Sequence, residues 1–400
     1  MRAGWFAPGF AAIAFAIAAV PCAIPVRAQV THAESGDSRL QDRLYSDPSG
    51  AIEHARKRVA AGDLPGAIKE LDLYVAGHPR EIEPARYLAD LYYRNSDSAS
   101  AERILLAILA YAPNDRETHN RLGGIYAAQD KVGAAIDEFQ KSLPSNGAFL
   151  RLVELHRKRG DLAAFTERYR NDADQRPQDG AAQFNYGQIL LALHRSAEAI
   201  VFFNRATAID PRSCQTLNEL GSAYLDVHKL SDAMLTLQRC LAFEPANYGA
   251  LVNLGLAYVM DGQIAKAHAA LQQAADARSD GPEALVDLGY VEDMQGQWET
   301  AVGYYLKALD VDPLFRDAYV NLGFDYHGHR LYKLAEAAFI KGLSVSPDDG
   351  RLHYLLGLTY ADQGKKALAL SEYEHAKTSD EPEVARAAVR DLSLLQSGTL

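Results

Sequence analysis

Residues 316–349 read RDAYVNLGFDYHGHRLYKLAEAAFIKGLSVSPDD, and residues 214–247 read CQTLNELGSAYLDVHKLSDAMLTLQRCLAFEPAN. Aligned, the two stretches share Leu-Gly at positions 7 and 8, Tyr at position 11, Ala at position 20 and Pro at position 32. The last of these positions recurs along the chain, at Pro79, Pro113, Pro177, Pro211, Pro245, Pro313 and Pro347. A fixed period of 34 residues indicates a solenoid of helical hairpins.

The period divides the chain into ten units. They begin at Pro48, Ile82, Arg116, Asn146, Gly180, Cys214, Tyr248, Pro282, Arg316 and Gly350. The step from Arg116 to Asn146 is 30 residues instead of 34, and Pro144 arrives early in it. Because proline ends a helix, the second helix of the third unit is predicted to be about one turn short.

The recurring positions fit two packed helices. Positions 7, 8 and 11 share one helical face, and so do positions 20, 24 and 27. Small residues at 8 and 20 let the two backbones approach, while large side chains at 11 and 24 fill the remaining space. Glycine closes the first helix at position 15 in several units, in a left-handed conformation. These glycines are Gly62, Gly160, Gly262, Gly296 and Gly364.

The pattern over residues 48–383 resembles the tetratricopeptide repeat, whose signature is Leu-Gly, then Tyr, Ala, Phe and Pro. The resemblance implies an all-α, right-handed superhelical solenoid of about ten hairpins. Residues 384–400 are predicted to form a capping helix and tail, because the last hairpin would otherwise expose its stacking surface. Its apolar stripe is Val384, Ala388, Leu392 and Leu395, with Arg386, Arg390 and Asp391 expected on other faces.

The N-terminal residues look like a targeting segment. Residues 1–28 contain Arg2, an apolar stretch rich in alanine, and Val26-Arg27-Ala28 ahead of Gln29, which resembles a secretory signal peptide. Residues 29–47 are polar and are predicted to be a linker. We expect a periplasmic or otherwise exported protein; the alternative is an uncleaved membrane anchor with the repeats outside the cytoplasm.

Charge and cysteine content narrow the interpretation further. The net charge of −11 repels phosphate backbones, so nucleic acid is not an expected partner. Beyond the targeting segment only Cys214 and Cys240 remain, at positions 1 and 27 of one unit. Antiparallel helices would offset them by about one turn, so we expect free cysteines, with Cys240 as a small buried residue; a disulfide needs favourable geometry.

By the same resemblance, the first helix of each hairpin lines a concave groove, with positions 2, 5, 6, 9, 12 and 13 facing it. In the C-terminal half these positions hold large apolar residues, a candidate surface for a partner peptide. The candidates at positions 5 and 9 are Val252, Leu256, Val286, Tyr290, Val320 and Phe324. The alternative is that many of them are buried between neighbouring units.

Position 6 carries a row of amides and carboxylates, namely Asn185, Glu219, Asn253, Asp287 and Asn321. It resembles the asparagine ladder of O-linked N-acetylglucosamine transferases, which implies that Asn185, Asn253 and Asn321 hold the backbone of an extended peptide. Every second member of this row is acidic, whereas the ladder of that family consists of asparagines. The alternative is that Asn before Leu-Gly is common in such repeats.

The N-terminal half of the groove is charged instead. Its basic residues form a weaker candidate anion site, and the alternative is a solvated face. These residues are Arg86, Arg121, Arg151, Arg157 and Lys158.

No catalytic or phosphate-binding motif occurs, and no cofactor is expected. Asp325, His327 and His329 form the one metal-like cluster, which is more often incidental. The predicted function is a non-catalytic scaffold or adaptor of the cell envelope that binds a protein or peptide, with envelope assembly or export machinery as expected partners. Two alternatives stay open: an arm that recruits a glycosyltransferase or polysaccharide-export machinery, and a self-assembling structural repeat protein.

Overall fold

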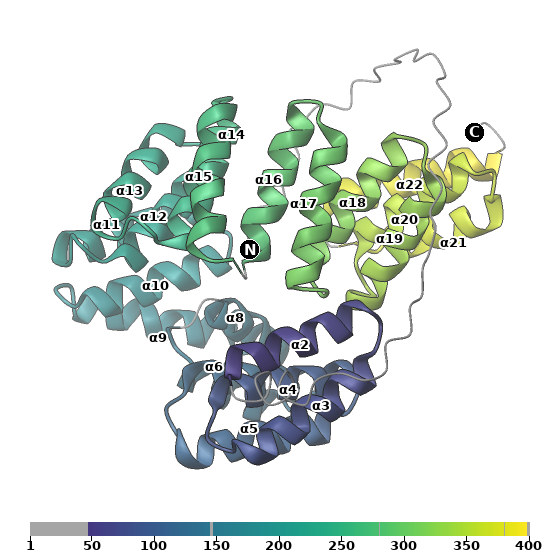
Figure 1. Cartoon of the computed structure of the whole chain (residues 1–400). Coiled ribbons are helices and arrows are strands. Elements are labelled where there is room, and N and C mark those ends of the chain that lie inside the picture. The colour runs from purple at the N-terminus through teal and green to yellow at the C-terminus, as the bar shows by residue number, and fades with distance from the viewer. Residues whose placement is uncertain (1–46, 145–146, 280, 380, 398–400) are drawn as a thin grey trace. The chain divides into compact units, whose positions relative to one another are not determined.

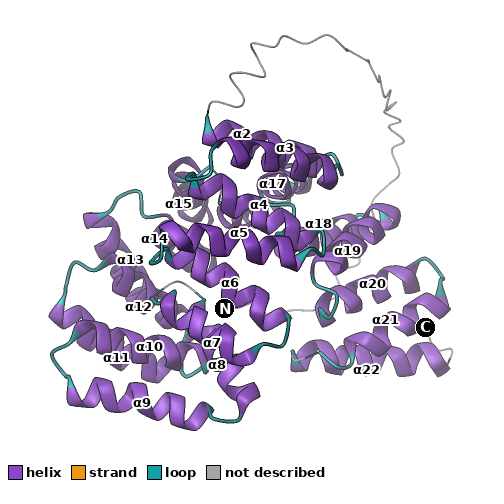
Figure 2. Ribbon diagram, turned by 90° about the horizontal axis from the view of Figure 1, so that it is seen from below, coloured by secondary structure: helices purple, strands orange, loops and turns teal. Residues whose placement is uncertain are grey.

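The computed structural model describes residues 47–144, 147–279, 281–379 and 381–397. Within these ranges the chain forms 21 α-helices and no strand. Twenty of the helices pair into ten hairpins, and one further helix follows the tenth hairpin (Figure 2). The predicted all-α solenoid of about ten hairpins with a terminal helix is confirmed.

The first helices of the hairpins are α2 (Pro48–Ala60), α4 (Ile82–Arg94), α6 (Arg116–Ala128), α8 (Ala148–Arg159), α10 (Gly180–Ala192), α12 (Cys214–Asp226), α14 (Tyr248–Met260), α16 (Pro282–Met294), α18 (Arg316–Gly328) and α20 (Gly350–Asp362). The second helices are α3 (Leu64–Gly77), α5 (Ser98–Tyr111), α7 (Val132–Lys141), α9 (Leu162–Gln175), α11 (Ser196–Ile209), α13 (Leu230–Phe243), α15 (Ile264–Ala277), α17 (Trp298–Val311), α19 (Tyr332–Val345) and α21 (Lys366–Ala376). The final helix is α22 (Pro382–Ser397). Each first helix except α8 begins at the first residue of its sequence unit.

The described residues divide into two compact units, those within 47–55 and 65–148 and those within 56–64 and 149–397. In the first unit α4 packs on α5, α5 on α6, and α6 on α7. In the second, the two helices of each hairpin from α10 to α21 lie side by side, and each second helix contacts the first helix of the next hairpin (Figure 1). The first helices also contact one another in the order α10, α12, α14, α16, α18 and α20.

The third hairpin confirms the prediction of a shortened second helix. Helix α7 has 10 residues, whereas the second helices on either side of it, α5 and α9, have 14 each. A difference of four residues is about one helical turn. The early Pro144 lies in the turn that follows α7.

Glycine at position 8 makes room for the side chain at position 24 of the same hairpin. A Cβ atom on Gly187 would lie 2.6 Å from Phe203, and one on Gly255 would lie 2.5 Å from Leu271. Phe203 and Leu271 are fully buried, and so are the alanines at position 20. The large side chain of the second helix therefore packs directly onto the backbone of the first, which is why the Leu-Gly pair recurs.

Position 15 has a positive φ in all ten hairpins. The five predicted glycines have φ between 71° and 85°, which confirms their left-handed conformation. The other five hairpins use Ser96, Asp130, His194, His228 and Arg330, with φ between 56° and 61°. The turn geometry is therefore set by the hairpin rather than by glycine, since these residues adopt the same conformation at some conformational cost.

Helix α22 packs on α21 and α20, as a cap on the last hairpin would. Ala388, Leu392 and Leu395 of the predicted stripe are buried, and Val384 is half-buried. Asp391 was expected on another face, but it is buried and accepts a hydrogen bond of 2.8 Å from the hydroxyl of Tyr354 on α20. A buried carboxylate with such a partner belongs to the packed face, which apolar spacing alone cannot reveal.

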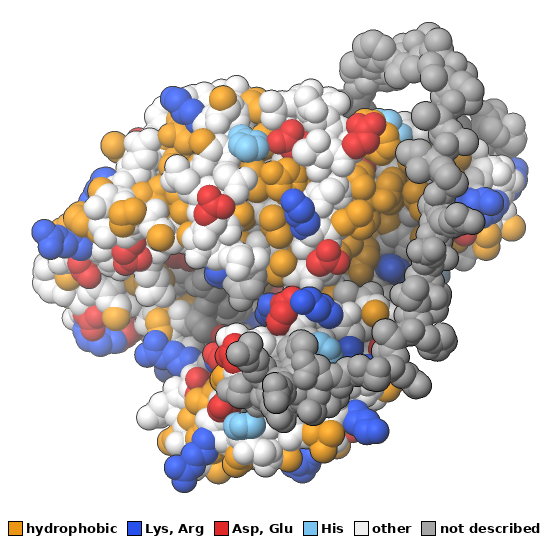
Figure 3. All heavy atoms as spheres, viewed as in Figure 1, with side chains coloured by type: hydrophobic (Ala, Val, Ile, Leu, Met, Phe, Trp, Pro, Cys, Tyr) orange, Lys and Arg blue, Asp and Glu red, His pale blue; other side chains and the backbone are white. Residues whose placement is uncertain are grey.

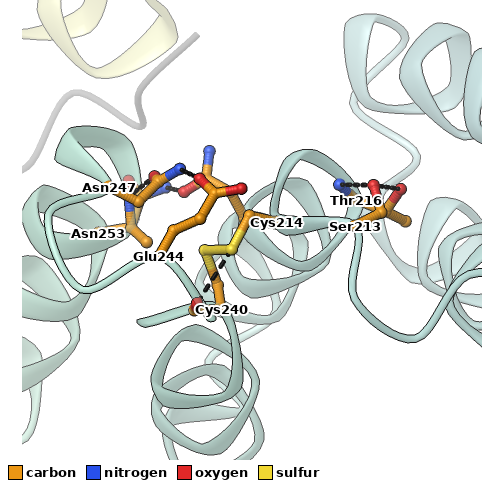
Figure 4. Close-up of a disulfide and its surroundings, with 9 residues drawn as sticks. Ser213, Cys214, Thr216, Cys240, Glu244, Asn247 and Asn253 are labelled. Atoms are coloured by element: carbon orange, nitrogen blue, oxygen red, sulfur yellow. Dashed lines mark hydrogen bonds between the residues drawn. A yellow bond between two sulfur atoms is a disulfide. The ribbon is translucent and has the colours of Figure 1, made fainter. Parts of the chain in front are cut away.

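Cys214 and Cys240 form a disulfide, so the expectation of two free cysteines is wrong. Cys214 begins α12 and Cys240 lies in the last turns of α13, at the same end of one hairpin (Figure 4). Their Cα atoms are 4.7 Å apart, within the range that a disulfide spans. The predicted offset of one helical turn overestimated the distance between the two cysteines, because α12 and α13 lie close together at this end of the hairpin.

The predicted signal peptide (residues 1–28) and nearly all of the predicted linker (29–47) lie outside the described residues. Among the helices that are described, none is both long enough and apolar enough to cross a membrane.

Candidate partner-binding surface

Position 9 of four consecutive first helices carries an apolar side chain that reaches the surface. The row consists of Leu256 on α14, Tyr290 on α16, Phe324 on α18 and Leu358 on α20. Phe324 is 46% exposed, and the other three are partly buried. Because these first helices contact one another in sequence, equivalent side chains follow one another across the hairpins. We call these four residues the position-9 row.

The valines at position 5 do not belong to this surface. Val252, Val286 and Val320 are 1%, 5% and 3% exposed, so the structure places them in the core rather than on a groove wall. Val286 on α16 packs in a cluster that includes Ala318 on the next first helix. Position 5 thus fills the seam between consecutive hairpins. Helical spacing could not reveal this, because the covering residues come from the neighbouring hairpin.

One amide of the predicted ladder is used inside the protein. Asn253 is 8% exposed, and its Nδ2 donates a hydrogen bond of 2.9 Å to Oδ1 of Asn218 on α12. This bond links two first helices. Asn185 and Asn321 are partly exposed. A peptide-binding ladder therefore rests on these two, because Asn253 is buried and one of its N–H groups is already used.

The first helices around the position-9 row carry mainly negative charge. Helices α10, α12, α14 and α16 contain no Lys or Arg. Their acidic residues are Glu219, Asp226, Glu283, Asp287, Glu292 and Asp293. Apolar side chains also gather at the surface over α16 to α18, among both acidic and basic groups (Figure 3). The local field favours cationic ligands and disfavours anionic ones.

Two of the row's first helices, α16 and α18, bring two carboxyls together, with Asp325 buried and Asp293 partly buried. Asp293 on α16 accepts a hydrogen bond of 2.6 Å from the hydroxyl of Tyr305, and burial raises its pKa. Asp325 on α18 is 8% exposed, and burial together with the neighbouring Asp293 raises the pKa of Asp325 to about 8. The pair therefore retains one proton at neutral pH. Sequence reasoning missed it because the two carboxyls are on different hairpins.

Asp325, His327 and His329 do not converge on a common point. His327 Nε2 lies 3.2 Å from Asp362, and its Nδ1 lies 3.0 Å from the hydroxyl of Thr359. The His329 ring stacks on Trp298, with centroids 4.1 Å apart. Across the described residues, no group of three or more His, Cys, Asp or Glu side chains could hold a metal ion.

The predicted basic cluster is divided between the two compact units, and two of its members are neutralised. Arg86 is buried and pairs with Glu83, with Asp115 at 3.5 Å. Arg121 pairs with Glu117 and with Asp90, the latter at 2.9 Å.

The remaining three basic residues lie in the second unit. Arg151 is exposed and lies 3.4 Å from Glu154, and Arg157 and Lys158 are exposed on the same helix, α8. An anion site at Arg151, Arg157 and Lys158 stays a prediction, without Arg86 and Arg121.

A family model described as tetratricopeptide repeat matches residues 88–149, 150–213, 218–282, 252–317 and 325–389. These segments cover well over half of the chain. The chain belongs to the tetratricopeptide repeat family. This tetratricopeptide repeat protein has the helical-hairpin fold through which such repeats generally bind other proteins, so the coarse function is that of a protein–protein interaction scaffold.

Several solved tetratricopeptide repeat structures resemble parts of the chain. MamA is 28% identical over 40% of this chain and 94% of its own, with a TM-score of 0.35. The APC/C hetero-tetramer Cut9–Hcn1 gives 15% identity, coverage of 88% of this chain and 85% of that chain, and a TM-score of 0.49. A tetratricopeptide repeat protein from Parabacteroides merdae ATCC 43184 gives 16% identity, 70% and 98% coverage, and a TM-score of 0.47. No curated protein matches the sequence.

Proposed function

We propose that this protein is a non-catalytic scaffold of the cell envelope that binds a partner segment along the position-9 row. The segment carries apolar side chains that contact the row and basic side chains that face the acidic first helices. The observation that carries this proposal is the continuity of the row, with Leu256, Tyr290, Phe324 and Leu358 on four consecutive hairpins.

The chemistry of the row supports a peptide ligand. Tyr290 and Phe324 are at its centre, and aromatic side chains commonly dominate binding energy at protein interfaces. Leu256 and Leu358 extend the apolar surface to either side, over a longer distance than a small molecule would need. Asn185 and Asn321 can pair with peptide groups whatever the ligand sequence, because an amide both donates and accepts.

The charge distribution supports a basic partner. With no Lys or Arg on the first helices α10, α12, α14 and α16, a cationic segment approaches these four helices without like-charge repulsion from them. Rim charges of this kind affect association rate and partner choice more than final affinity. We therefore expect added salt to slow association with the partner strongly and to change the dissociation rate only weakly.

Two features support an envelope location. Residues 1–28 resemble a secretory signal peptide, and disulfides such as Cys214–Cys240 persist mainly in oxidising compartments. We therefore propose envelope assembly or export machinery as the source of the partner. The residues that would decide between a cleaved signal and an anchor lie outside the described ranges.

The triple change Leu256→Ala, Tyr290→Ala and Phe324→Ala is expected to weaken partner binding at least about 100-fold, because two or three hot-spot residues account for several kcal/mol. The matched control is Val201→Ala, Leu235→Ala and Leu306→Ala, three exposed apolar residues on second helices. The partners that the wild type captures from envelope extracts are identified first. The amount of each partner is then measured on the wild type, the row variant and the control variant.

Loss of capture by the row variant, with capture retained by the control, supports the proposal. Equal capture by the row variant and the wild type rejects the row as the binding surface. Circular dichroism on each variant verifies that the hairpins are folded.

A further inference from the structure

Position 4 of the first helix holds a histidine between two acceptors in the third hairpin. The Nδ1 atom of His119 lies 2.6 Å from Oε2 of Glu138 on α7. Its Nε2 atom lies 2.9 Å from the backbone carbonyl of Pro113, in the turn that joins α5 to α6. His119 and Glu138 are 5% and 9% exposed. The ring thus connects the inter-hairpin turn with the second helix of its own hairpin.

The same arrangement recurs in the tenth hairpin. The Nδ1 atom of His353 lies 2.7 Å from Oε2 of Glu372 on α21, and its Nε2 atom lies 2.9 Å from the carbonyl of Pro347. Histidine, glutamate and proline occupy the same unit positions as in the third hairpin. Two independent copies, one in each compact unit, show that the contact follows from the repeat geometry.

These contacts require a proton. A neutral imidazole has one N–H, but a carbonyl and a carboxylate are both acceptors, so two hydrogen bonds need two protons shared between the ring and the carboxylate. The arrangement is either an imidazolium with a carboxylate or a neutral ring with a protonated glutamate. Loss of one proton leaves two acceptor atoms facing each other at hydrogen-bond distance, which is repulsive.

In two other hairpins, position 4 bonds to a carbonyl of the preceding hairpin or turn without an imidazole. At position 4 of the fifth hairpin, Gln183 donates a hydrogen bond of 2.6 Å to the carbonyl of Ala173 at the end of the preceding hairpin. In the ninth hairpin, the hydroxyl of Tyr319 donates one of 3.0 Å to the carbonyl of Pro313. In the other six hairpins position 4 is Ala, Phe or Leu, so a polar side chain bonds to a preceding carbonyl in four hairpins, and the third and tenth do so with a histidine–glutamate pair.

We propose that His119 and His353 are proton-dependent latches, which hold the turn at the start of their hairpins while protonated and release it when the proton is lost. Their bonds are present at low pH and are lost as the pH rises. The third and tenth hairpins become looser in alkaline conditions, whereas the fifth and ninth do not.

Other charged groups surround the two rings. Lys141 on α7 lies 2.7 Å from the second carboxylate oxygen of Glu138 and competes for its charge. On α21, the ring of His375 stacks on His353 with centroids 4.8 Å apart, so a charge on one disfavours a charge on the other. On the side of the preceding turns, each site has an arginine–aspartate pair, Arg86 with Asp115 and Arg316 with Asp349. Arg86 also pairs with Glu83, and Arg316 also pairs with Asp317, so carboxylates balance both arginines. The glutamates are the acidic groups that contact the rings directly.

The double variant His119→Gln, His353→Gln tests the proposal, because glutamine keeps an N–H donor at position 4 but does not titrate. We expect the wild type to have the higher Tm at pH 5.5, by about 4 °C, and the difference to vanish by pH 8.5. Taking the difference removes other titrations, including that of the Asp293–Asp325 pair. His228→Asn, in an exposed turn with a positive φ that asparagine also tolerates, is the control and should follow the wild type.

A Tm difference that is the same at every pH overturns the proposal. Nitrogen-15 NMR of the histidine rings provides a second measurement that needs no folded variant. Signals of two rings that hold a shared proton at pH 6 and lose it on titration, with a simultaneous change at a glutamate carboxyl, support the latch. If every buried ring is neutral at pH 6 and no glutamate is protonated there, the latch does not exist.

Discussion

Replacing Phe203 with alanine is expected to lower the free energy of unfolding by about 3–5 kcal/mol. Its ring is fully buried at position 24, where it rests on the backbone of α10 at Gly187 and contacts Phe184 at 5.8 Å between ring centroids. Removing the ring leaves a cavity that close-packed helices cannot fill. Denaturant unfolding followed by circular dichroism measures the loss, with hydrogen exchange of α10 and α11 as a local readout.

Val201→Ala serves as the control, because Val201 is on the same helix but 49% exposed and should change stability by less than about 0.5 kcal/mol. Equal losses for the two variants would show that position 24 does not hold the hairpin together. In a repeat protein the loss is expected to stay near the fifth hairpin, since stability is transmitted only between neighbours.

Removing the disulfide is expected to have the second large effect. The double variant Cys214→Ala, Cys240→Ala should unfold about 3 kcal/mol more easily, because the bond closes a loop with a sequence separation of 26 residues. Wild-type protein treated with a reductant should approach the variant, whereas the variant itself should not respond to the reductant. Alanine fits both sites, since both cysteines are buried and small residues are common at position 27.

Thiol labelling of the unfolded, unreduced wild type provides the direct check. We expect no free thiol from Cys214 or Cys240. Two labelled cysteines in protein isolated from an oxidising compartment would contradict the disulfide, and the sixth hairpin would then rest on packing alone.

The periodic part of the fold could be predicted from the sequence because each signal is local. Gly187 and Phe203 lie within one hairpin, and the early Pro144 acts on the helix directly before it. The chain spacing therefore gave the helix starts, the short α7 and the left-handed residues at position 15. The left-handed conformation of Arg330 and His194 was not predicted, because residues other than glycine adopt it less often and glycine is its main sign in a sequence.

Features that depend on two hairpins were harder to predict. Val286 was expected on the surface, but Ala318 and its neighbours in the next hairpin cover it. Asn253 was expected to bind a peptide, yet it pairs with Asn218 of the preceding hairpin. Helical spacing determines which side chains share a face, but the stacking of hairpins decides which of those faces is covered.

The candidate surface was predicted in part for the same reason. Of the apolar candidates, Leu256, Tyr290 and Phe324 at position 9 reach the surface, while the three valines at position 5 do not. Positions 5 and 9 are four residues apart in each first helix, so their side chains lie on the same side of that helix. Position 5 is nonetheless buried, because it lies against the adjoining first helix.

The most direct test of the scaffold function is photo-crosslinking from the position-9 row in the native envelope. A photoreactive phenylalanine analogue replaces Phe324 in one protein and Leu235, which is 62% exposed on a second helix, in another. We predict that position 324 crosslinks to one partner segment rich in apolar and basic residues, that unlabelled wild-type protein competes for it, and that position 235 does not yield this product. Crosslinking of the same partner from position 235 but not from position 324 would contradict binding along the row.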